Sequence, residues 1–139
     1  SSGNLLPTKG LAFISLKDKH KNEGIDLAKK LVQLNFTLCG TEGTANVIRN
    51  SGIKCKKVNK VSAGSPHIVD ILNAKKIALV INTGGGKRKY RIQDSTSLRR
   101  ATLINKVPYC TNMSTAYACL EGIKSLKSKK INVKPIQKL

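Results

Sequence analysis

The chain has 139 residues, a length that suits one domain, and 40 % of them are hydrophobic, which is enough for a core. Lys and Arg number 26 against 7 Asp and Glu, so the formal net charge is +19, while aromatic residues make up only 4 %. No apolar run approaches the roughly 18 residues of a membrane span, so the composition argues against an integral membrane protein, and we expect a cytoplasmic one.

The first half of the chain alternates short apolar runs with segments in which apolar residues recur at helical spacing. The apolar runs predict buried strands, and the segments between them predict helices. In the order strand, helix, strand, helix, strand, the expected elements are residues 11–15, 25–34, 36–39, 45–50 and 56–59.

The second half continues this alternation, and Pro66 stands where the first turn of a helix accepts proline. Residues 77–81 are apolar throughout, as the central strand of a parallel sheet should be. The expected elements are a helix at 67–74, a strand at 77–81, a basic loop at 87–91, a helix at 95–105, a strand at 107–110 and a helix at 111–123.

Strands separated by helices predict βαβ units, and therefore a single α/β sandwich built on a parallel sheet. We assign residues 1–9 to a tag or linker and residues 10–125 to the folded domain. Residues 126–139 form a polar C-terminal tail with one candidate short strand at 132–136.

The cysteines and histidines do not have the spacing of a metal site. Closed zinc sites usually need paired, closely spaced ligands, and neither the four Cys nor the two His supply a CxxC-like pair. We expect no metal ligand and interpret the cysteines as reduced thiols of a cytosolic protein. They are Cys39, Cys55, Cys110 and Cys119.

Hydrogen-bond donors and glycines follow four of the predicted strands, and Glu42 is the one acid among them. In an open parallel sheet, ligands bind outside the carboxyl ends of the strands, where the strand order reverses. We therefore predict a site for a phosphate monoester or a similar small polyanion. The candidate ligand-binding residues are Ser15, Lys21, Thr41, Gly43, Thr44, Lys60, Asn82 and Thr83.

Each residue type in this set has a physical reason to contact phosphate. The hydroxyls of Thr41 and Thr44, with free amides at a helix N-terminus, would cradle the anion. Lys21 and Lys60 would supply the positive charge, and Gly43 would let the backbone come close. The alternative is that the two threonines only cap the helix, and that glycines 84–86 only form a flexible loop.

No residue pattern predicts catalysis. A general acid or base should stand at the same strand ends, but Asp70 falls inside a predicted helix and Asp94 precedes one. His67 either faces the ligand or packs beside Pro66. With no nucleophile elbow, paired carboxylates or metal triad, we predict binding without chemistry and no catalytic residue.

Several blocks of the sequence together resemble the C-terminal allosteric domain of the carbamoyl-phosphate synthase large subunit, which has the methylglyoxal synthase-like fold. The resemblance covers roughly residues 9–125 in collinear order. The blocks are Gly40-Thr41-Glu42-Gly43-Thr44-Ala45, Val58-Asn59-Lys60-Val61, Gly64-Ser65-Pro66-His67-Ile68, Ile81-Asn82-Thr83, Asp94-Ser95 and Leu98-Arg99-Arg100-Ala101.

The resemblance implies a three-layer sandwich with a five-stranded parallel sheet, and a domain that holds an effector and no cofactor of its own. The effector in bacterial-type members is a nucleotide monophosphate, UMP or IMP. The parent enzyme uses ATP and Mg or Mn, and the implied partners are its synthetase domains and a small glutaminase subunit or domain. The implied phosphate contacts are Ser15, Lys21, Thr41, Thr44 and Lys60, with Asn82 and Thr83 on the nucleotide.

Two rival functions remain open. Methylglyoxal synthase, a phosphate-eliminating lyase, carries catalytic Asp and His residues, whereas Pro66 falls near one such Asp position and the loop after Thr83 holds neither type before Asp94. The high positive charge also suits a basic nucleic-acid-binding module. However, the lysines are spread along the chain and few aromatic rings are available for stacking, so we do not expect a nucleic-acid partner.

Overall fold

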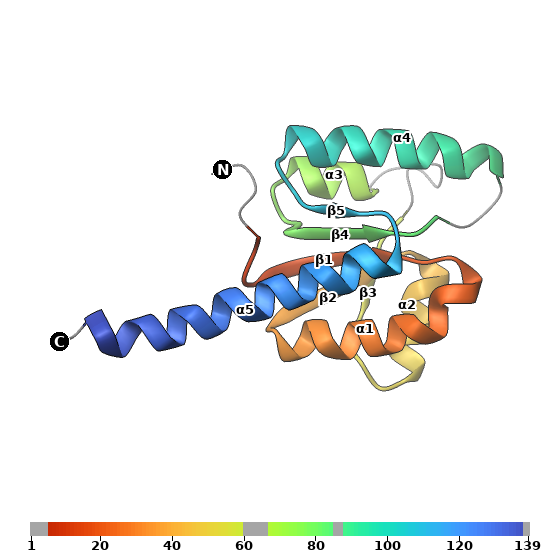
Figure 1. Ribbon diagram of the computed structural model, residues 1–139. Helices are drawn as coiled ribbons and strands as arrows, with labels where there is room; N and C mark the ends of the chain where they lie inside the picture. The colour runs from red at the N-terminus through yellow and green to blue at the C-terminus, as the bar shows by residue number, and fades with distance from the viewer. Residues whose placement is uncertain (1–5, 60–66, 85–87, 138–139) are drawn as a thin grey trace.

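The computed structural model describes residues 6–59, 67–84 and 88–137, with the backbone alone for 88–95 and 130–137. Five parallel strands form one sheet in the order β3-β2-β1-β4-β5 (Figure 1). The strands are β1 (Gly10–Ser15), β2 (Phe36–Gly40), β3 (Lys56–Lys57), β4 (Leu79–Asn82) and β5 (Tyr109–Cys110).

Five α-helices and one short 3-10 helix connect and cover these strands. They are η2 (Asp18–His20), α1 (Lys21–Gln33), α2 (Glu42–Asn50), α3 (Ile68–Asn73), α4 (Arg88–Ile104) and α5 (Met113–Gln137). Among the residues that the structure describes, no helix is both long enough and apolar enough to cross a membrane.

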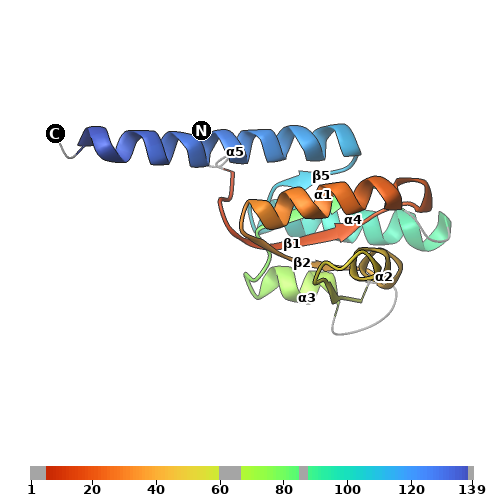
Figure 2. The same ribbon diagram turned by 90° about the horizontal axis from the view of Figure 1, so that it is seen from below.

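The helices cover both faces of the sheet and so make three layers (Figures 1 and 2). Successive residues of a strand point to opposite faces, so Phe13 and Ile14 belong to different clusters of the core. Ile14 packs with residues of α1, α2 and α5, whereas Phe13 packs with residues of α3 and α4. The predicted α/β fold, a five-stranded parallel sheet between helical layers, is confirmed.

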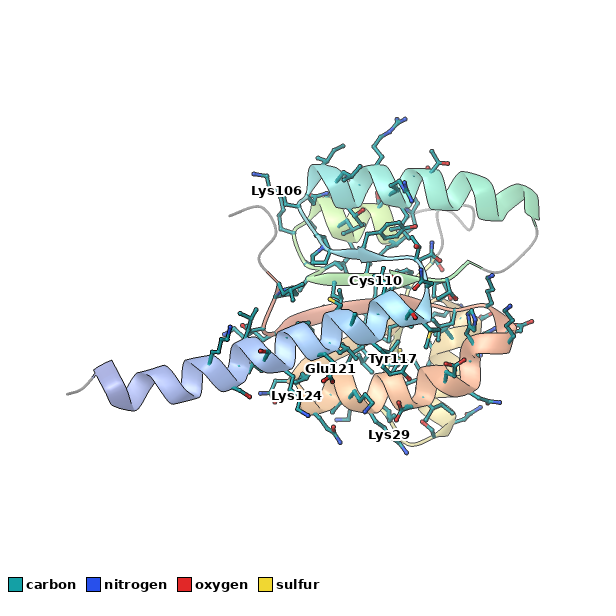
Figure 3. The ribbon with its side chains drawn as sticks, viewed as in Figure 1. Lys29, Lys106, Cys110, Tyr117, Glu121 and Lys124 are labelled. Carbon is teal, nitrogen blue, oxygen red and sulfur yellow. The ribbon has the colours of Figure 1, made fainter. Side chains whose placement is uncertain are left out.

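Helix α5 lies against α1 and then continues past the sheet toward the C-terminus (Figure 2). Ile123 is fully buried in the core, and the Tyr117 hydroxyl reaches across to α1, where it donates to Asp26 Oδ2 at 2.9 Å (Figure 3). Farther along, Lys127 Nζ donates to the carbonyl of Leu34. These contacts fix α5 on the α1 face.

The structure corrects two expectations from the sequence. The candidate strand at 132–136 does not form, because α5 continues through these residues to Gln137. Residues 123–134 contain neither Gly nor Pro, so the helix extends as far as Pro135, and it ends two residues later at Gln137. The basic loop expected at 87–91 is also wrong from Arg88 onward, where α4 has already begun.

Candidate functional site

The predicted ligand residues that the structure describes, all but Lys60, lie around the carboxyl ends of β1, β2 and β4. The chain passes from β1 to β2 and β3 on one side and then returns to place β4 on the other side of β1. The strand order therefore reverses between β1 and β4, where Ser15 pairs with Asn82. On the other side of β1, Gly40 pairs with Ile14, which brings the start of α2 to the same place.

Three buried hydroxyl groups form a cluster at this reversal point, and we call Ser15, Thr41 and Thr44 the hydroxyl cluster. Thr41 Oγ1 lies 3.3 Å from Ser15 Oγ and 3.4 Å from Thr44 Oγ1. The three residues are only 7 %, 5 % and 1 % exposed. Thr44 Oγ1 also accepts a hydrogen bond from the Leu16 N–H at 3.0 Å, so the cluster is fixed to the loop that follows β1.

Thr83 fixes the same loop from the β4 side. Its N–H donates to the Ser15 carbonyl at 2.9 Å, and its hydroxyl oxygen accepts from the Lys17 N–H at 3.0 Å. The residue is 6 % exposed, so these bonds are shielded from water. Thr83 therefore holds the backbone after β1 in place, and its hydroxyl oxygen is already used within the protein.

The N-terminus of α2 opens onto the hydroxyl cluster. Thr41 is the N-cap residue of α2, with extended backbone angles, but its side chain makes no capping hydrogen bond. Thr41 therefore does not serve as a side-chain cap of α2 in the structure. The first-turn amides of a helix carry a partial positive charge, which favours an anion at this position.

Lys21 brings a full positive charge to the same helix end. A Cβ atom placed on Gly43 would lie 2.9 Å from Lys21 Nζ, so the ammonium rests directly against the first turn of α2. A side chain at position 43 would displace this ammonium, which is the end of a flexible side chain. Lys21 Nζ also pairs with Asp18 Oδ1 at 2.5 Å.

Asn82 points toward the neighbouring strand β5. Its Nδ2 donates to the Tyr109 hydroxyl at 3.2 Å, and its Oδ1 accepts from the Gly84 N–H at 3.1 Å. The Arg99 guanidinium lies 6.0 Å from the centre of the Tyr109 ring. Tyr109 was not among the residues predicted for the site; it lies in the strand predicted at 107–110, and only the structure places that strand beside β4.

The remaining predicted residue, Lys60, lies outside the described residues, as do Pro66 and the loop at 85–87. The neighbouring Asn59 pairs with His67 by an isolated parallel bridge, and its carbonyl accepts from the Ile68 N–H at 3.0 Å. This bridge places the start of α3 next to the chain that leaves β3.

Besides Asp18, which pairs with Lys21, two acids near the site have partners of their own. Glu42 accepts from Lys57 Nζ at 2.9 Å, and this ammonium lowers the pKa of the Glu42 carboxyl. Asp70 accepts from the His67 N–H at 3.0 Å within the first turn of α3. The described residues contain no group of three or more His, Cys, Asp or Glu side chains that could hold a metal ion.

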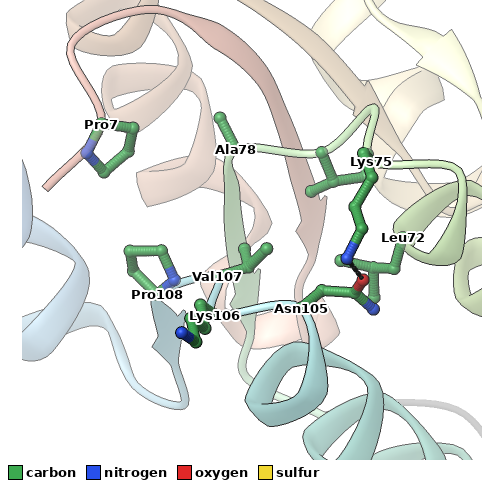
Figure 4. Close-up of a pocket in the computed structure, with 9 residues that line it drawn as sticks. Pro7, Leu72, Lys75, Ala78, Asn105, Lys106, Val107 and Pro108 are labelled. Atoms are coloured by element: carbon green, nitrogen blue, oxygen red, sulfur yellow. Dashed lines mark hydrogen bonds between the residues drawn. The ribbon is translucent and has the colours of Figure 1, made fainter. Parts of the chain in front are cut away.

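A hollow of about 230 Å³ lies at the other end of the strands, next to the residues that precede β4 and β5 (Figure 4). Lys75 Nζ donates to Asn105 Oδ1 at 2.6 Å within it. It holds none of the predicted ligand residues. Its lining consists of Pro7, Leu72, Lys75, Ile77, Ala78, Asn105, Lys106, Val107 and Pro108.

The parallel sheet, the strand reversal and the donors around it define an α/β domain whose ligand end is suited to small anions. The family model described as "MGS-like domain" matches residues 23–111. The chain belongs to the MGS-like domain family.

Curated relatives with high similarity are large chains of carbamoyl phosphate synthase. The large chain of Rhizobium meliloti is 41 % identical over 132 residues, which are 95 % of this chain and 11 % of that protein. The C-terminal section of the large chain of Aquifex aeolicus is 43 % identical over 130 residues, 94 % of this chain and 24 % of that protein. The corresponding section of Methanopyrus kandleri is 41 % identical over 133 residues, which are 96 % of this chain and 24 % of that protein. This chain therefore spans a quarter or less of these relatives.

A solved structure supports the same fold. Methylglyoxal synthase from Elizabethkingia anophelis superposes with a TM-score of 0.65 over 83 % of this chain and 79 % of that chain. The two sequences are 18 % identical, so the likeness shows a shared fold and no more.

Proposed function

We propose that this domain binds a nucleotide monophosphate effector of the UMP or IMP type and regulates a carbamoyl phosphate synthase large chain. The observation that carries the proposal is the meeting of the hydroxyl cluster, the N-terminus of α2 and the Lys21 ammonium at the strand reversal. Each of these groups can donate to phosphate oxygens, and charge-assisted hydrogen bonds contribute about 1.5–3 kcal/mol each.

The proposal assigns the phosphate to the hydroxyl cluster, Lys21, Lys60 and the backbone at Gly43. Asn82 and Thr83 are assigned to the nucleoside side of the ligand. No cofactor is assigned to the domain itself, and binding proceeds without chemistry.

In the longer protein, the synthetase domains make carbamoyl phosphate for pyrimidine and arginine biosynthesis, with ATP, Mg or Mn, and ammonia from a glutaminase subunit or domain. The effector would bias these domains between two states of different activity. Such a bias requires that the ligand bind one state more tightly, and a coupling of about 1–3 kcal/mol is typical. The relatives support this role, because they are large chains and C-terminal sections of that synthase.

Calorimetric titration with UMP, IMP and the phosphate-free nucleoside uridine tests the proposal. We expect UMP or IMP to bind and uridine to bind far more weakly. Thr41→Val removes one buried donor and should weaken nucleotide binding by about 1.5–3 kcal/mol, or roughly 10- to 150-fold. Thr37→Val is the matched control, because Thr37 is an exposed residue of β2, the strand that leads to Thr41, and its change should leave the affinity unchanged. Equal loss in both variants, or equal binding of uridine and UMP, would contradict the proposal.

Methylglyoxal synthase activity is the competing function, because the fold is shared with that enzyme. Incubation with dihydroxyacetone phosphate should release no inorganic phosphate above the uncatalysed rate. Clear turnover that is lost in Asp94→Asn would replace the regulatory proposal with a lyase.

A basic nucleic-acid-binding module predicts a different outcome. Its affinity for many unrelated sequences would fall steeply with salt, and nucleotide monophosphates would compete poorly. We expect nucleotide monophosphates to bind more tightly than unrelated nucleic-acid sequences.

A further inference from the structure

Two of the four cysteines, Cys110 and Cys119, lie against each other on one face of the sheet. Cys110 is the last residue of β5 and is 3 % exposed. Cys119 lies on α5, where it is half-buried and packs against the core cluster that contains Cys110 (Figure 3). The Cys110 thiol donates a hydrogen bond to the Cys119 sulfur. The proposed anion site uses neither residue.

The strand order keeps Cys55 away from this pair. Cys55 directly precedes β3, which forms one edge of the sheet, whereas Cys110 belongs to β5 at the other edge. Four spacings of about 4.8 Å separate these edges, so the two residues lie roughly 19 Å apart, whereas the Cα atoms of a disulfide lie roughly 5.5 Å apart. Cys39 packs in the core cluster on the opposite face of the sheet. The fold therefore allows one pairing among the four thiols.

The two thiols of this pair differ in access and in acidity. Cys119 is half-buried and Cys110 is buried, so Cys119 is the first to meet a reagent in solution. The hydrogen bond from Cys110 lowers the pKa of Cys119, and the same bond together with burial raises the pKa of Cys110. Because the thiolate is the reactive form of cysteine, Cys119 is the attacking thiol and Cys110 is the thiol that stands behind it.

We propose that Cys110 and Cys119 form a redox-active dithiol, which a low-molecular-weight disulfide such as oxidised glutathione converts to an intramolecular disulfide. The Cys119 thiolate attacks one sulfur of oxidised glutathione, so that a mixed disulfide forms and one glutathione thiolate leaves. Cys110 then gives up its proton, and its sulfur attacks the Cys119 sulfur and expels the second glutathione. The cysteines lose two electrons and two protons, and oxidised glutathione is reduced to two molecules of glutathione. The product joins β5 to α5 by a covalent bond.

The test exposes the folded chain to oxidised glutathione, alkylates the remaining thiols with N-ethylmaleimide in denaturant, and analyses the tryptic peptides by mass spectrometry. Residues 107–124 hold both cysteines and contain no Lys or Arg before Lys124, so trypsin keeps the pair on one peptide. We expect this peptide to lose the mass of two hydrogen atoms and to take up no N-ethylmaleimide. Cys39 and Cys55 should both be alkylated.

Three variants make the test specific. Cys55→Ala is the matched control, because Cys55 lies at the opposite edge of the sheet, and its peptide 107–124 should be oxidised as in wild type. In Cys110→Ala, Cys119 should keep glutathione, since no second thiol is there to release it. In Cys119→Ala, which changes a half-buried helical position, Cys110 should stay alkylated. A lasting glutathione adduct on wild-type Cys119, a disulfide that includes Cys39 or Cys55, or alkylation of all four cysteines would overturn the proposal.

Discussion

The hydroxyl of Thr44 both belongs to the hydroxyl cluster and supports the loop after β1. Its oxygen accepts from the Leu16 N–H, and its residue is 1 % exposed. A buried N–H without a partner costs about 1–3 kcal/mol, so a change at Thr44 would disturb stability and binding together. Gly43 allows the two effects to be separated, because it is exposed and contacts only the end of a flexible lysine side chain.

We expect Gly43→Ala to weaken nucleotide binding without loss of stability. The new Cβ would stand 2.9 Å from Lys21 Nζ, so the ammonium must move away from the end of α2. If the moved ammonium loses about half of the free energy of a charge-assisted hydrogen bond, binding weakens by about 0.7–1.5 kcal/mol, or roughly 3- to 12-fold in affinity. The free energy of unfolding should not fall, because Ala is the better helix former.

Calorimetry and urea denaturation measure the two quantities on the same samples. Asn46→Ala, an exposed change on the same helix, is the control and should leave the affinity unaltered. If Gly43→Ala binds the nucleotide as tightly as wild type, Lys21 is not a ligand in this position.

At the scale of the elements, hydrophobic patterning located β1, β2 and β4, because buried parallel strands are short and apolar. The strand β3 consists of two exposed lysines, so apolar patterning does not explain its place. Hydrophobic patterning located helix ends poorly, since the first turn of α4 contains polar residues that fit a loop or a helix equally well. The strand predicted in the tail was wrong for a related reason: isolated Ile and Val residues after Ile123 resemble a strand, but they belong to the continuing helix α5.

For the candidate site, the sequence predicted which residues lie at the strand ends but not the hydrogen bonds that they form. The residues at strand ends could be chosen, because topology brings carboxyl ends to one edge. The hydrogen bonds of Thr83 with Lys17 and of Asn82 with Tyr109 could not be predicted, because they depend on three-dimensional placement. That these residues bind a nucleotide stays a prediction.

The packing of α5 gives a prediction at this scale. Ile123 is 0 % exposed, so Ile123→Ala should lower the free energy of unfolding by about 2–5 kcal/mol through lost burial and the cavity left behind. Leu103→Ala is the control, because Leu103 is 73 % exposed and its truncation should change stability by less than about 0.5 kcal/mol. Denaturant midpoints measure both, and similar values for the two variants would show that α5 does not share the core.

For the whole molecule, buried thiols make stability depend on alkaline pH. Burial raises the pKa of Cys39 to about 12 and that of Cys55 to about 11. Thiols of an unfolded chain ionise near 8.5, so above that pH the folded state holds more protons than the unfolded state. The stabilisation is therefore complete below about pH 8.5 and is lost as the pH rises through the folded values.

We expect the free energy of unfolding to decrease between about pH 9 and pH 11 in reducing buffer. The decisive measurement is a comparison with the double variant Cys39→Ala, Cys55→Ala, which isolates the contribution of these two thiols. Urea denaturation should give a flatter pH dependence for the double variant than for wild type. Parallel curves would mean that these thiols do not contribute.

The extension of α5 past the sheet has a mechanical consequence. From Lys127, which still contacts the end of α1, to Gln137 the helix rises by about 15 Å at 1.5 Å per residue. A tilt of about 10° at the packed end would therefore move the far end by about 2.6 Å, as a lever arm. Helix α1, against which α5 rests, begins at Lys21, so the lever pivots on the element that starts at the proposed anion site.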